Sequence, residues 1–204
     1  GGIRLGAAIV RRLVSDGWPV AIHARKSATA RPLAQELTAQ GHEVAVVEGD
    51  LSNADAAEKI FAQVREKLGL CTFLVNSAAA FAYDDISTGS AETMDGLYHS
   101  NLRAPALLSH EFVKQLEGRG LIVNLLDQKV FNLNPDFLSY TIMKAAMQSA
   151  TQLLAMALAP KVRVVGIAPG LTLRSGEQTE EGCKQAHDKA PLGHGSTPDD
   201  IAEG

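Results

Sequence analysis

Cysteine is scarce in this chain of 204 residues, which contains only Cys71 and Cys183. This content does not indicate a disulfide framework, so a reducing, cytoplasmic location is expected. Long apolar segments are missing as well, because no run approaches the roughly 18 residues that a membrane-spanning helix needs. The amino-terminal sequence "GGIRLGAAIVRRLV" also lacks the arrangement of a signal peptide. No membrane partner is therefore expected.

The chain has no long basic run, and its formal net charge is -4. A nucleic-acid partner is therefore not expected. The six histidines are scattered without the spacing of a metal site, and no metal is predicted. Hydrophobic residues make up 46% and charged residues 21% of the chain, which allows a buried core and argues against disorder. The length suits one domain, so residues 1–204 are expected to form a single domain.

Apolar segments of strand length alternate with segments of helical periodicity along the chain. Strand patterns occur at 19–24, 43–50, 71–78, 120–127 and 162–170, and helix patterns occur at 5–16, 28–41, 53–69, 91–117 and 140–158. Each connection is long enough for a crossover helix, so the sheet is expected to be parallel with helices on both faces. The predicted fold class is α/β, a doubly wound parallel sheet of the Rossmann-like type.

Polar residues gather where the predicted strands end. They are His23, Arg25, Lys26, Asp50, Asn76, Ser77, Asp127, Pro169 and Gly170. Ligands of such sheets bind beyond the carboxyl ends of the strands. One ligand site is therefore predicted along the rim that these strand ends form. The segment from about 172 to 197 is rich in glycine and in polar and charged residues, and it is expected to form a loop over the substrate.

The two ends of the chain depart from a complete sheet. The chain starts where a first strand and the first glycine of a phosphate-binding turn should just have ended, and its last residues, "TPDDIAEG", resemble the start of a helix. The sheet is therefore expected to lack its first and last strands in this chain. Without a central strand, the chain is expected to fold poorly or to bind a nucleotide weakly.

The stretch "FLSYTIMK" (137–144) places Tyr140 four residues before Lys144. On a helix these positions share one face. A cation beside a phenol lowers the pKa of the phenol, which makes it a usable proton donor or acceptor near neutral pH. The alternative is a surface tyrosine and a solvated lysine on an amphipathic helix.

Several motifs together resemble the short-chain dehydrogenase/reductase family over essentially the whole chain. They are "YTIMK", "LVNSAAA", "SNLRAP" with Asn101, "GDLSN" with Asp50 and "APG" at 168–170. The segment "GGIRLG" resembles the end of the family's glycine-rich turn, with Arg4 where a glycine is usual. The resemblance implies a nicotinamide-dependent oxidoreductase with a small-molecule substrate. It also implies a homotetramer, built partly from the helices predicted at 91–117 and 140–158.

Departures from the family's common pattern resemble its pteridine reductase branch, which includes dihydromonapterin reductase-like proteins. Asp127 stands where the family has a catalytic serine, Arg4-Leu5-Gly6 replaces Gly-Ile-Gly, Phe81 falls where that branch places a stacking ring, and "PGLTL" (169–173) also matches it. Ser77 and Ala79 differ from this branch. The resemblance implies hydride transfer from NADPH to a dihydropterin or a dihydrofolate-like ring. A general carbonyl or 3-oxoacyl reductase and a non-catalytic nucleotide-binding protein remain open.

The resemblance assigns catalytic roles to four residues. Tyr140 would be the proton donor, and Lys144 would bind the nicotinamide ribose and hold down the pKa of Tyr140. Asp127 would hydrogen-bond Tyr140 beside the substrate; the alternative is an aspartate that caps a loop. Asn101 would keep a water for proton relay, or would instead kink its helix and bond to backbone groups. Phe81 would stack the substrate, or would be an ordinary core residue.

The end of the first predicted strand, "HARKS", carries no acid that could bind a ribose 2′-hydroxyl. Arg25, Lys26 and Ser27 could instead meet a 2′-phosphate, so NADPH is predicted; the alternative is a solvated basic turn. The complete set of expected cofactor contacts is Arg4, Leu5, Arg25, Lys26, Ser27, Asp50, Leu51, Asn76, Ser77, Ala78, Tyr140, Lys144, Pro169, Gly170 and Leu171.

Overall fold

The computed structural model of the protein describes residues 4–174, 179–188, 190 and 192–204. Its strands are β1 (Val20–Ala24), β2 (Val44–Glu48), β3 (Phe73–Asn76), β4 (Gly120–Leu125) and β5 (Val162–Ile167). Its α-helices are α1 (Arg4–Ser15), α2 (Arg31–Ala39), α3 (Ala56–Leu68), α4 (Ala91–Tyr98), α5 (Ala104–Gln115), α6 (Leu138–Leu158), α7 (Glu180–Asp188) and α8 (Pro198–Glu203).

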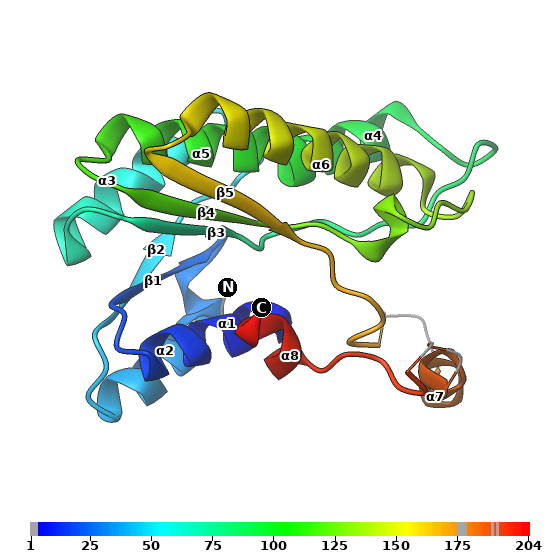
Figure 1. Ribbon diagram of the computed structural model, residues 1–204, viewed down its shortest axis with the longest axis horizontal. Helices are drawn as coiled ribbons and strands as arrows, with labels where there is room; N and C mark the ends of the chain where they lie inside the picture. The colour runs from blue at the N-terminus through cyan, green and yellow to red at the C-terminus, as the bar shows by residue number, and fades with distance from the viewer. Residues whose placement is uncertain (1–3, 175–178, 189, 191) are drawn as a thin grey trace.

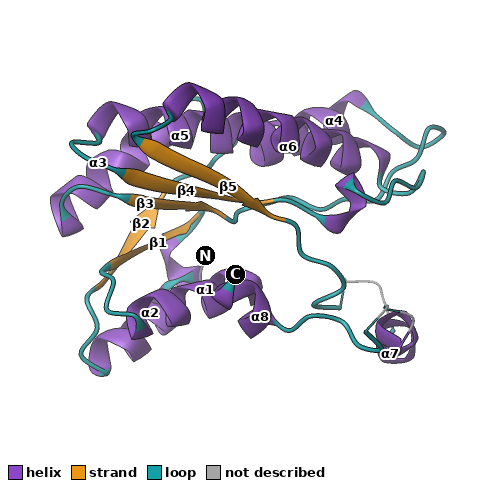
Figure 2. Ribbon diagram, viewed as in Figure 1, coloured by secondary structure: helices purple, strands orange, loops and turns teal. Residues whose placement is uncertain are grey.

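Every strand pair in the described chain is parallel, as predicted. β1 pairs with β2, while β4 pairs with β3 on one side and β5 on the other. Helices α3, α5 and α6 cover one face of the strands, and α1, α2 and α8 cover the other, while α4 packs against α6 beyond the strand ends (Figures 1 and 2). The Rossmann-like α/β architecture predicted from the alternation is confirmed.

The strands do not form one continuous sheet. They form a two-stranded sheet and a three-stranded sheet in the described chain, and an apolar cavity of about 390 Å³ lies between β1 and β3. Its walls include Ile9, Val20, Ile22, Phe61, Leu74 and Leu108. In the described chain, β1 is paired only with β2 and β3 only with β4, so the edges of β1 and β3 that border the cavity have no strand partner.

The cavity corrects one expectation about β3, whose continuous apolar sequence predicts burial on both faces. Phe73, Leu74 and Val75 are only partly buried, and Asn76 alone is fully buried. The reason is that these residues line the cavity, so part of their surface has no packing partner.

Separate apolar clusters hold the layers together. Val10 and Val14, one turn apart on α1, pack with Ile22 of β1 and with Leu33 and Leu37 of α2. On the other face, α3, α5 and the second sheet share a cluster (Phe61, Phe112, Leu116, Ile122, Val162 and Val164). Each sheet therefore has its own buried core, one on each side of the cavity.

The helix predicted at 91–117 is interrupted. After α4, a π-helical turn spans His99–Arg103 and leads directly into α5. Pro105 stands at the start of α5, where it has no N–H to donate to the preceding turn. A π turn inside a helix commonly marks a functional site, and this one contains Asn101.

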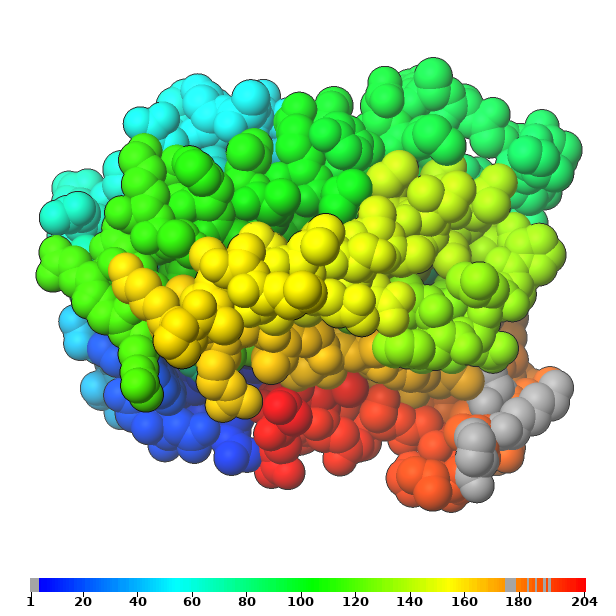
Figure 3. Space-filling view, turned by 45° about the horizontal axis from the view of Figure 1, so that its top comes forward, coloured from blue at the N-terminus to red at the C-terminus, as the bar shows by residue number. Residues whose placement is uncertain are grey.

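The carboxy-terminal segment differs from the loop predicted at 172–197. It contains α7, and residues 175–178, 189 and 191 lie outside the described residues. Thr197 and Asp200 form a reciprocal capping box at the start of α8. α8 lies beside α1, where Arg12 Nη1 is 2.9 Å from Glu203 Oε1 (Figure 3).

Candidate active site

Tyr140 and Asp127 meet at the carboxyl end of β4. Tyr140 lies in the first turn of α6, and its hydroxyl donates a hydrogen bond of 2.8 Å to Asp127 Oδ2. The other oxygen, Asp127 Oδ1, accepts the backbone N–H of Lys129 at 2.9 Å. The carboxylate therefore bonds to the phenol and caps the short turn that follows β4, so the loop-capping alternative and the tyrosine contact both occur.

Lys144 is buried beneath this pair. Its side chain is 5% exposed, and its Nζ donates a hydrogen bond of 2.6 Å to the backbone carbonyl of Leu125. Nζ lies 5.7 Å from the centre of the Tyr140 ring. Burial lowers the pKa of Lys144 to about 8, although the charge of Asp127 acts in the opposite direction. The solvated-lysine alternative is therefore wrong.

The pKa of Tyr140 is raised, which corrects the expectation that Lys144 holds it down. Burial is the largest cause, followed by the charge of Asp127 and by the hydrogen bond to that carboxylate. Lys144 is not among the causes that shift this pKa, and its ammonium is directed to the Leu125 carbonyl. The phenol is therefore protonated at neutral pH, which is the state of a proton donor.

Asn101 fixes the loop that follows β3. It is 1% exposed, and its amide makes two hydrogen bonds of 2.9 Å with Ala80, one to the N–H and one to the carbonyl. The backbone-bonding role is thus present, and the water relay stays a prediction. This loop leads to Phe81, so Asn101 anchors the wall on which that ring sits.

A row of aromatic rings packs beside the Tyr140 ring. Phe81 is 52% exposed and is not a core residue. Its ring meets the Tyr140 ring edge-on, with centroids 4.8 Å apart, and stacks on Phe137 at 4.4 Å. Tyr83 meets the other side of Phe137 at 5.1 Å. Phe137 itself has a left-handed backbone (φ 55°), a conformation that a bulky side chain rarely adopts outside functional sites.

Asp84 was not predicted as a site residue, yet it positions the start of α6, the helix that carries Tyr140 and Lys144. It is 1% exposed; its Oδ1 accepts the Ser139 N–H at 3.0 Å and its carbonyl accepts the Leu138 N–H at 3.1 Å. Phe137, at the start of α6, provides no side-chain cap. Asp84 therefore supplies the missing cap from a distant loop, and no local sequence signal reveals this contact.

Asn76 was expected to line the cofactor ribose, but its side chain is directed into the protein. Its Nδ2 donates to Asn124 Oδ1 at 2.8 Å, and Asn124 Nδ2 donates in turn to Thr151 Oγ1 at 3.0 Å. The network joins β3, β4 and α6 through buried polar groups. Only the backbone of Asn76 and the following residues, Ser77 and Ala78, remain on the rim.

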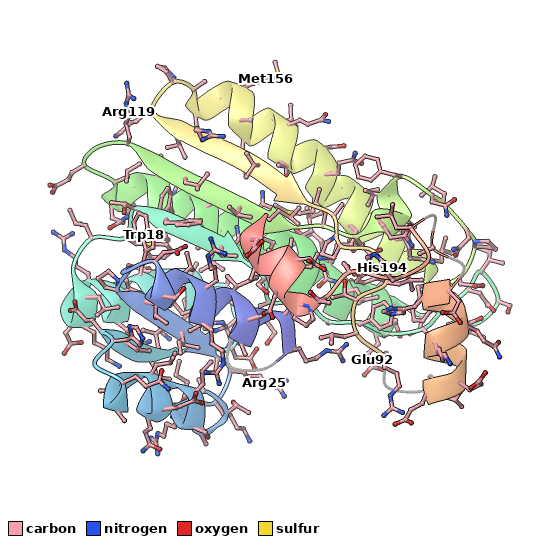
Figure 4. The ribbon with its side chains drawn as sticks, turned by 60° about the horizontal axis from the view of Figure 1, so that its bottom comes forward. Trp18, Arg25, Glu92, Arg119, Met156 and His194 are labelled. Atoms are coloured by element: carbon pink, nitrogen blue, oxygen red, sulfur yellow. The ribbon has the colours of Figure 1, made fainter. Side chains whose placement is uncertain are left out.

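The basic turn lies at the other end of the rim, after β1. Arg25 and Lys26 are exposed, and Figure 4 shows Arg25 at the edge of the molecule. The backbone N–H of Ser27 donates to Glu48 Oε2 at 2.6 Å, and Arg31 Nη2 is 3.4 Å from Ser27 Oγ. Arg31 and Lys26 both lower the pKa of Glu48, so two cations lie near this backbone donor, and such a donor set suits a phosphate group.

The remaining predicted contacts are distributed along the same rim. Asp50 forms a tight turn by accepting the N–H of Ser52 at 3.0 Å, and Leu51 follows it in sequence. The Pro169 carbonyl accepts the Gln128 N–H at 3.0 Å, which ties the end of β5 to the turn of Asp127. Gly170 and Leu171 follow and are exposed.

The side chains of Arg4 and Leu5 make other contacts than the rim contacts predicted for them. Arg4 Nη2 donates to the carbonyl of Arg174 at 3.2 Å, and Leu5 packs against a cluster that includes Ile201 of α8. The side chain of Leu5 therefore belongs to the contact between α1 and α8. Arg4 instead links α1 to the segment after β5.

The described residues show no candidate metal site and no candidate membrane-spanning helix. They contain no group of three or more histidine, cysteine, aspartate or glutamate side chains that could hold a metal ion. None of their helices combines the length and apolar character needed to cross a bilayer.

Comparison with known proteins agrees with this geometry. A family model described as enoyl-(acyl carrier protein) reductase matches residues 2–204. FolM alternative dihydrofolate reductase 1 from Brucella suis, solved in complex with NADP, is 36% identical with a TM-score of 0.95, over 99% of this chain and 82% of that chain. A blue fluorescent protein from a metagenomic library, solved with NADPH, is 24% identical with a TM-score of 0.92, over 100% of this chain and 85% of that one.

The curated relatives that are similar in sequence are named as an oxidoreductase and a dehydrogenase/reductase. The uncharacterized oxidoreductase YjdA of Bacillus subtilis is 32% identical over 97% of this chain and 81% of its own length. Human dehydrogenase/reductase SDR family member 4 is 31% identical over 82% of this chain and 62% of its own length. The chain therefore belongs to the short-chain dehydrogenase/reductase family.

Proposed function

We propose that this chain, an NAD(P)-dependent oxidoreductase by its family, reduces a pterin ring with NADPH and uses Tyr140 as the proton donor. The observation that carries the proposal is the hydrogen bond of 2.8 Å between the Tyr140 hydroxyl and Asp127 Oδ2. An aspartate stands here where the family commonly has a serine. The FolM proteins from Brucella suis and Brucella canis, which are named alternative dihydrofolate reductases, support the pterin class of substrate.

The proton is held on the phenol. Tyr140 is the donor in its bond with Asp127, and its raised pKa keeps the hydroxyl protonated. Delivery to a ring nitrogen requires the hydroxyl to exchange Asp127 Oδ2 for the substrate as its acceptor. Asp127 can then take up a solvent proton and return it to the phenol, because the two oxygens are already within hydrogen-bond distance.

NADPH, when bound, supplies the hydride. The residues that would hold it run along the rim: Arg25, Lys26 and Ser27 at the 2′-phosphate, Asp50 and Leu51 at the adenine, and the backbone of Asn76 to Ala78 at the ribose. Lys144 would face the nicotinamide ribose, and Pro169, Gly170 and Leu171 would border the ring. Arg4 and Leu5 begin α1, whose amino terminus suits a pyrophosphate.

Phe81 would provide the platform for the substrate ring. About half of its side chain is exposed, and its edge-on contact with Tyr140 places the exposed surface next to the proton donor. A flat heteroaromatic ring stacks favourably on such a surface. Phe137 already covers one face of Phe81, so a pterin would stack on the free face or displace the Phe137 ring.

The experiment measures NADPH oxidation by the protein with a dihydropterin, a dihydrofolate, simple ketones and a 3-oxoacyl thioester. Asp127→Ser and Asp127→Asn are tested alongside, since the asparagine keeps the shape and an acceptor oxygen without the charge. Turnover of the pterin that is lost in Asp127→Ser is the expected result. Turnover of ketones only, or turnover improved by the serine, would identify a general carbonyl reductase. Nucleotide binding without any turnover would identify a non-catalytic binding protein.

We also propose that copies of the chain assemble through α6 into a tetramer. Ile142, Leu153 and Met156 on this helix are 45%, 66% and 80% exposed, and Figure 4 shows Met156 projecting from it. Large exposed apolar side chains on one helix are typical of a contact surface. Light scattering of the wild type and of Leu153→Glu/Met156→Glu tests this; a monomeric wild type would contradict it.

A further inference from the structure

Glu48 is the last residue of β2, and its carboxylate is seated in the basic turn that follows β1. We propose that this carboxylate is an internal stand-in for the 2′-phosphate of the nucleotide, and that it must leave the Ser27 N–H before a phosphate can bind there. Glu48 would thus be a specificity-determining residue for the cofactor. This inference rests on the proposed use of NADPH but not on the pterin.

The contacts define the position as an anion site. The Ser27 N–H donates to Glu48 Oε2 at 2.6 Å, a short distance typical of a charge-assisted hydrogen bond. This bond is the largest cause that lowers the pKa of Glu48; Arg31 and Lys26 lower it further, while desolvation opposes them. The glutamate is therefore ionised at neutral pH, and one negative charge is already in place.

A second anion cannot share this donor. A 2′-phosphate bonded to the Ser27 N–H would lie against the carboxylate, and two negative charges at that distance repel each other. Glu48 is free to move because its side chain is exposed, whereas its backbone is held by Gln63, which donates to its carbonyl at 2.8 Å and accepts its N–H at 3.0 Å. The carboxylate can thus swing away without any change in β2.

The consequence differs between the two nicotinamide cofactors. A nucleotide with a 2′-phosphate must displace the carboxylate, while a nucleotide with a free 2′-hydroxyl can leave it in place. Removing the negative charge of Glu48 should therefore strengthen binding of the phosphorylated ligand alone. The effect has the size of a solvent-screened charge interaction, about fivefold in the dissociation constant.

The test uses titration calorimetry with adenosine 2′,5′-bisphosphate and with adenosine 5′-monophosphate, which differ only in the 2′-phosphate. The variants are Glu48→Gln, Glu48→Ala and the control Glu43→Gln. Glu43 is exposed and lies just before the opposite end of β2, so its replacement removes the same charge away from the turn. Neither the pterin nor turnover enters the measurement.

We expect both Glu48 variants to bind the bisphosphate about fivefold more tightly than wild type, with binding of the monophosphate and the control unchanged. A wild type that prefers the bisphosphate, with Glu48 variants equal to it, would overturn the inference and leave the proposed cofactor intact. Tightening of both ligands, or equal tightening in the control, would also overturn it. No preference in any variant would reject both the inference and the 2′-phosphate site.

Discussion

The two ends of the rim hold their charged groups in opposite ways. At the catalytic end, Tyr140 and Lys144 are each 5% exposed and each is hydrogen-bonded to the protein. At the other end, Arg25 and Lys26 are exposed side chains in a turn. Burial fixes positions and shifts pKa values, whereas exposure leaves charges screened by solvent. Single changes at the catalytic end should therefore have much larger effects.

The largest effect is expected from Tyr140→Phe. This change removes the hydroxyl that carries the proton. It keeps the ring, its edge-on contact with Phe81, and its place in the apolar cluster that Tyr140 forms with Leu97. Turnover should fall by about 100- to 10,000-fold, the usual contribution of a general acid. Steady-state kinetics with the best substrate measures the loss.

Nucleotide affinity provides the control for Tyr140→Phe. Tyr140 is only one of the expected cofactor contacts and the basic turn is unchanged, so the dissociation constant of NADPH should rise by no more than about tenfold, the value of one lost hydrogen bond. A variant that keeps more than a tenth of the wild-type turnover would remove Tyr140 from the role of proton donor.

The pKa of Lys144 predicts a pH dependence of stability. It is lowered to about 8 in the folded chain, and the ordinary value is 10.5, so between pH 8 and pH 10 the unfolded chain binds more protons at this residue. Its contribution therefore makes the free energy of unfolding rise with pH, by up to about 1.4 kcal/mol per pH unit. Tyr140 acts in the opposite direction only above its ordinary pKa of 10.0.

Urea unfolding at pH 8, 9 and 10 measures this dependence in wild type, Lys144→Met and Lys26→Met. The buried variant should lose the rise, while the variant at the exposed end should keep it. Using the difference between variants removes the contributions of the other titrating groups. Equal pH profiles for all three proteins would show that burial of Lys144 does not control its protonation.

Asp84→Ala should have a smaller effect, because it acts indirectly, through the start of α6, the helix that carries Tyr140 and Lys144. It leaves the Ser139 N–H without its acceptor and should lower the free energy of unfolding by about 1–2 kcal/mol, the usual value of a helix cap. The alanine variant should also lower kcat more than it raises KM, because Tyr140 is displaced from its working position.

Asp84→Asn separates positioning from charge, since its Oδ1 can still accept the Ser139 N–H. It should restore most of both the stability and the kcat that the alanine variant loses. Chemical denaturation and kinetics of the two variants give the comparison. An asparagine variant as impaired as the alanine variant would point to a role for the charge instead of the cap.

The sequence predicted the fold and the hydrogen bond between Tyr140 and Asp127 better than it predicted their surroundings. Strand and helix periodicity is local, and the order of elements and the parallel pairing follow from it. The pairing of Tyr140 with Asp127 was predicted from motifs. The position of the cavity between β1 and β3 was not predicted, because the sequence pattern does not report which strand edges remain unpaired.

The contacts that sequence reasoning missed join residues far apart in the chain. Asp84 caps a helix 55 residues away, and Asn124 binds an asparagine 48 residues away. The direction of the Tyr140 pKa was also wrong, since the adjacent lysine was visible in the sequence but the burial that outweighs it was not. Glu48 is different, because a charged residue that ends an apolar strand beside the rim is a signal that the sequence does contain.

Lys26→Gln should produce the smallest effect, at the exposed end of the rim. The lysine contributes one solvent-screened charge beside Ser27, so the KM for NADPH should rise by no more than about fivefold, with kcat unchanged. The difference from wild type should shrink as salt is raised from 0.05 M to about 1 M, where the screening length falls to about 3 Å. The loss in Tyr140→Phe should not respond to salt, because removal of a proton donor is not a screened interaction. A salt-independent loss in Lys26→Gln would mean that the basic turn becomes buried around its ligand, and the contrast between the two ends would then exist only before the nucleotide binds.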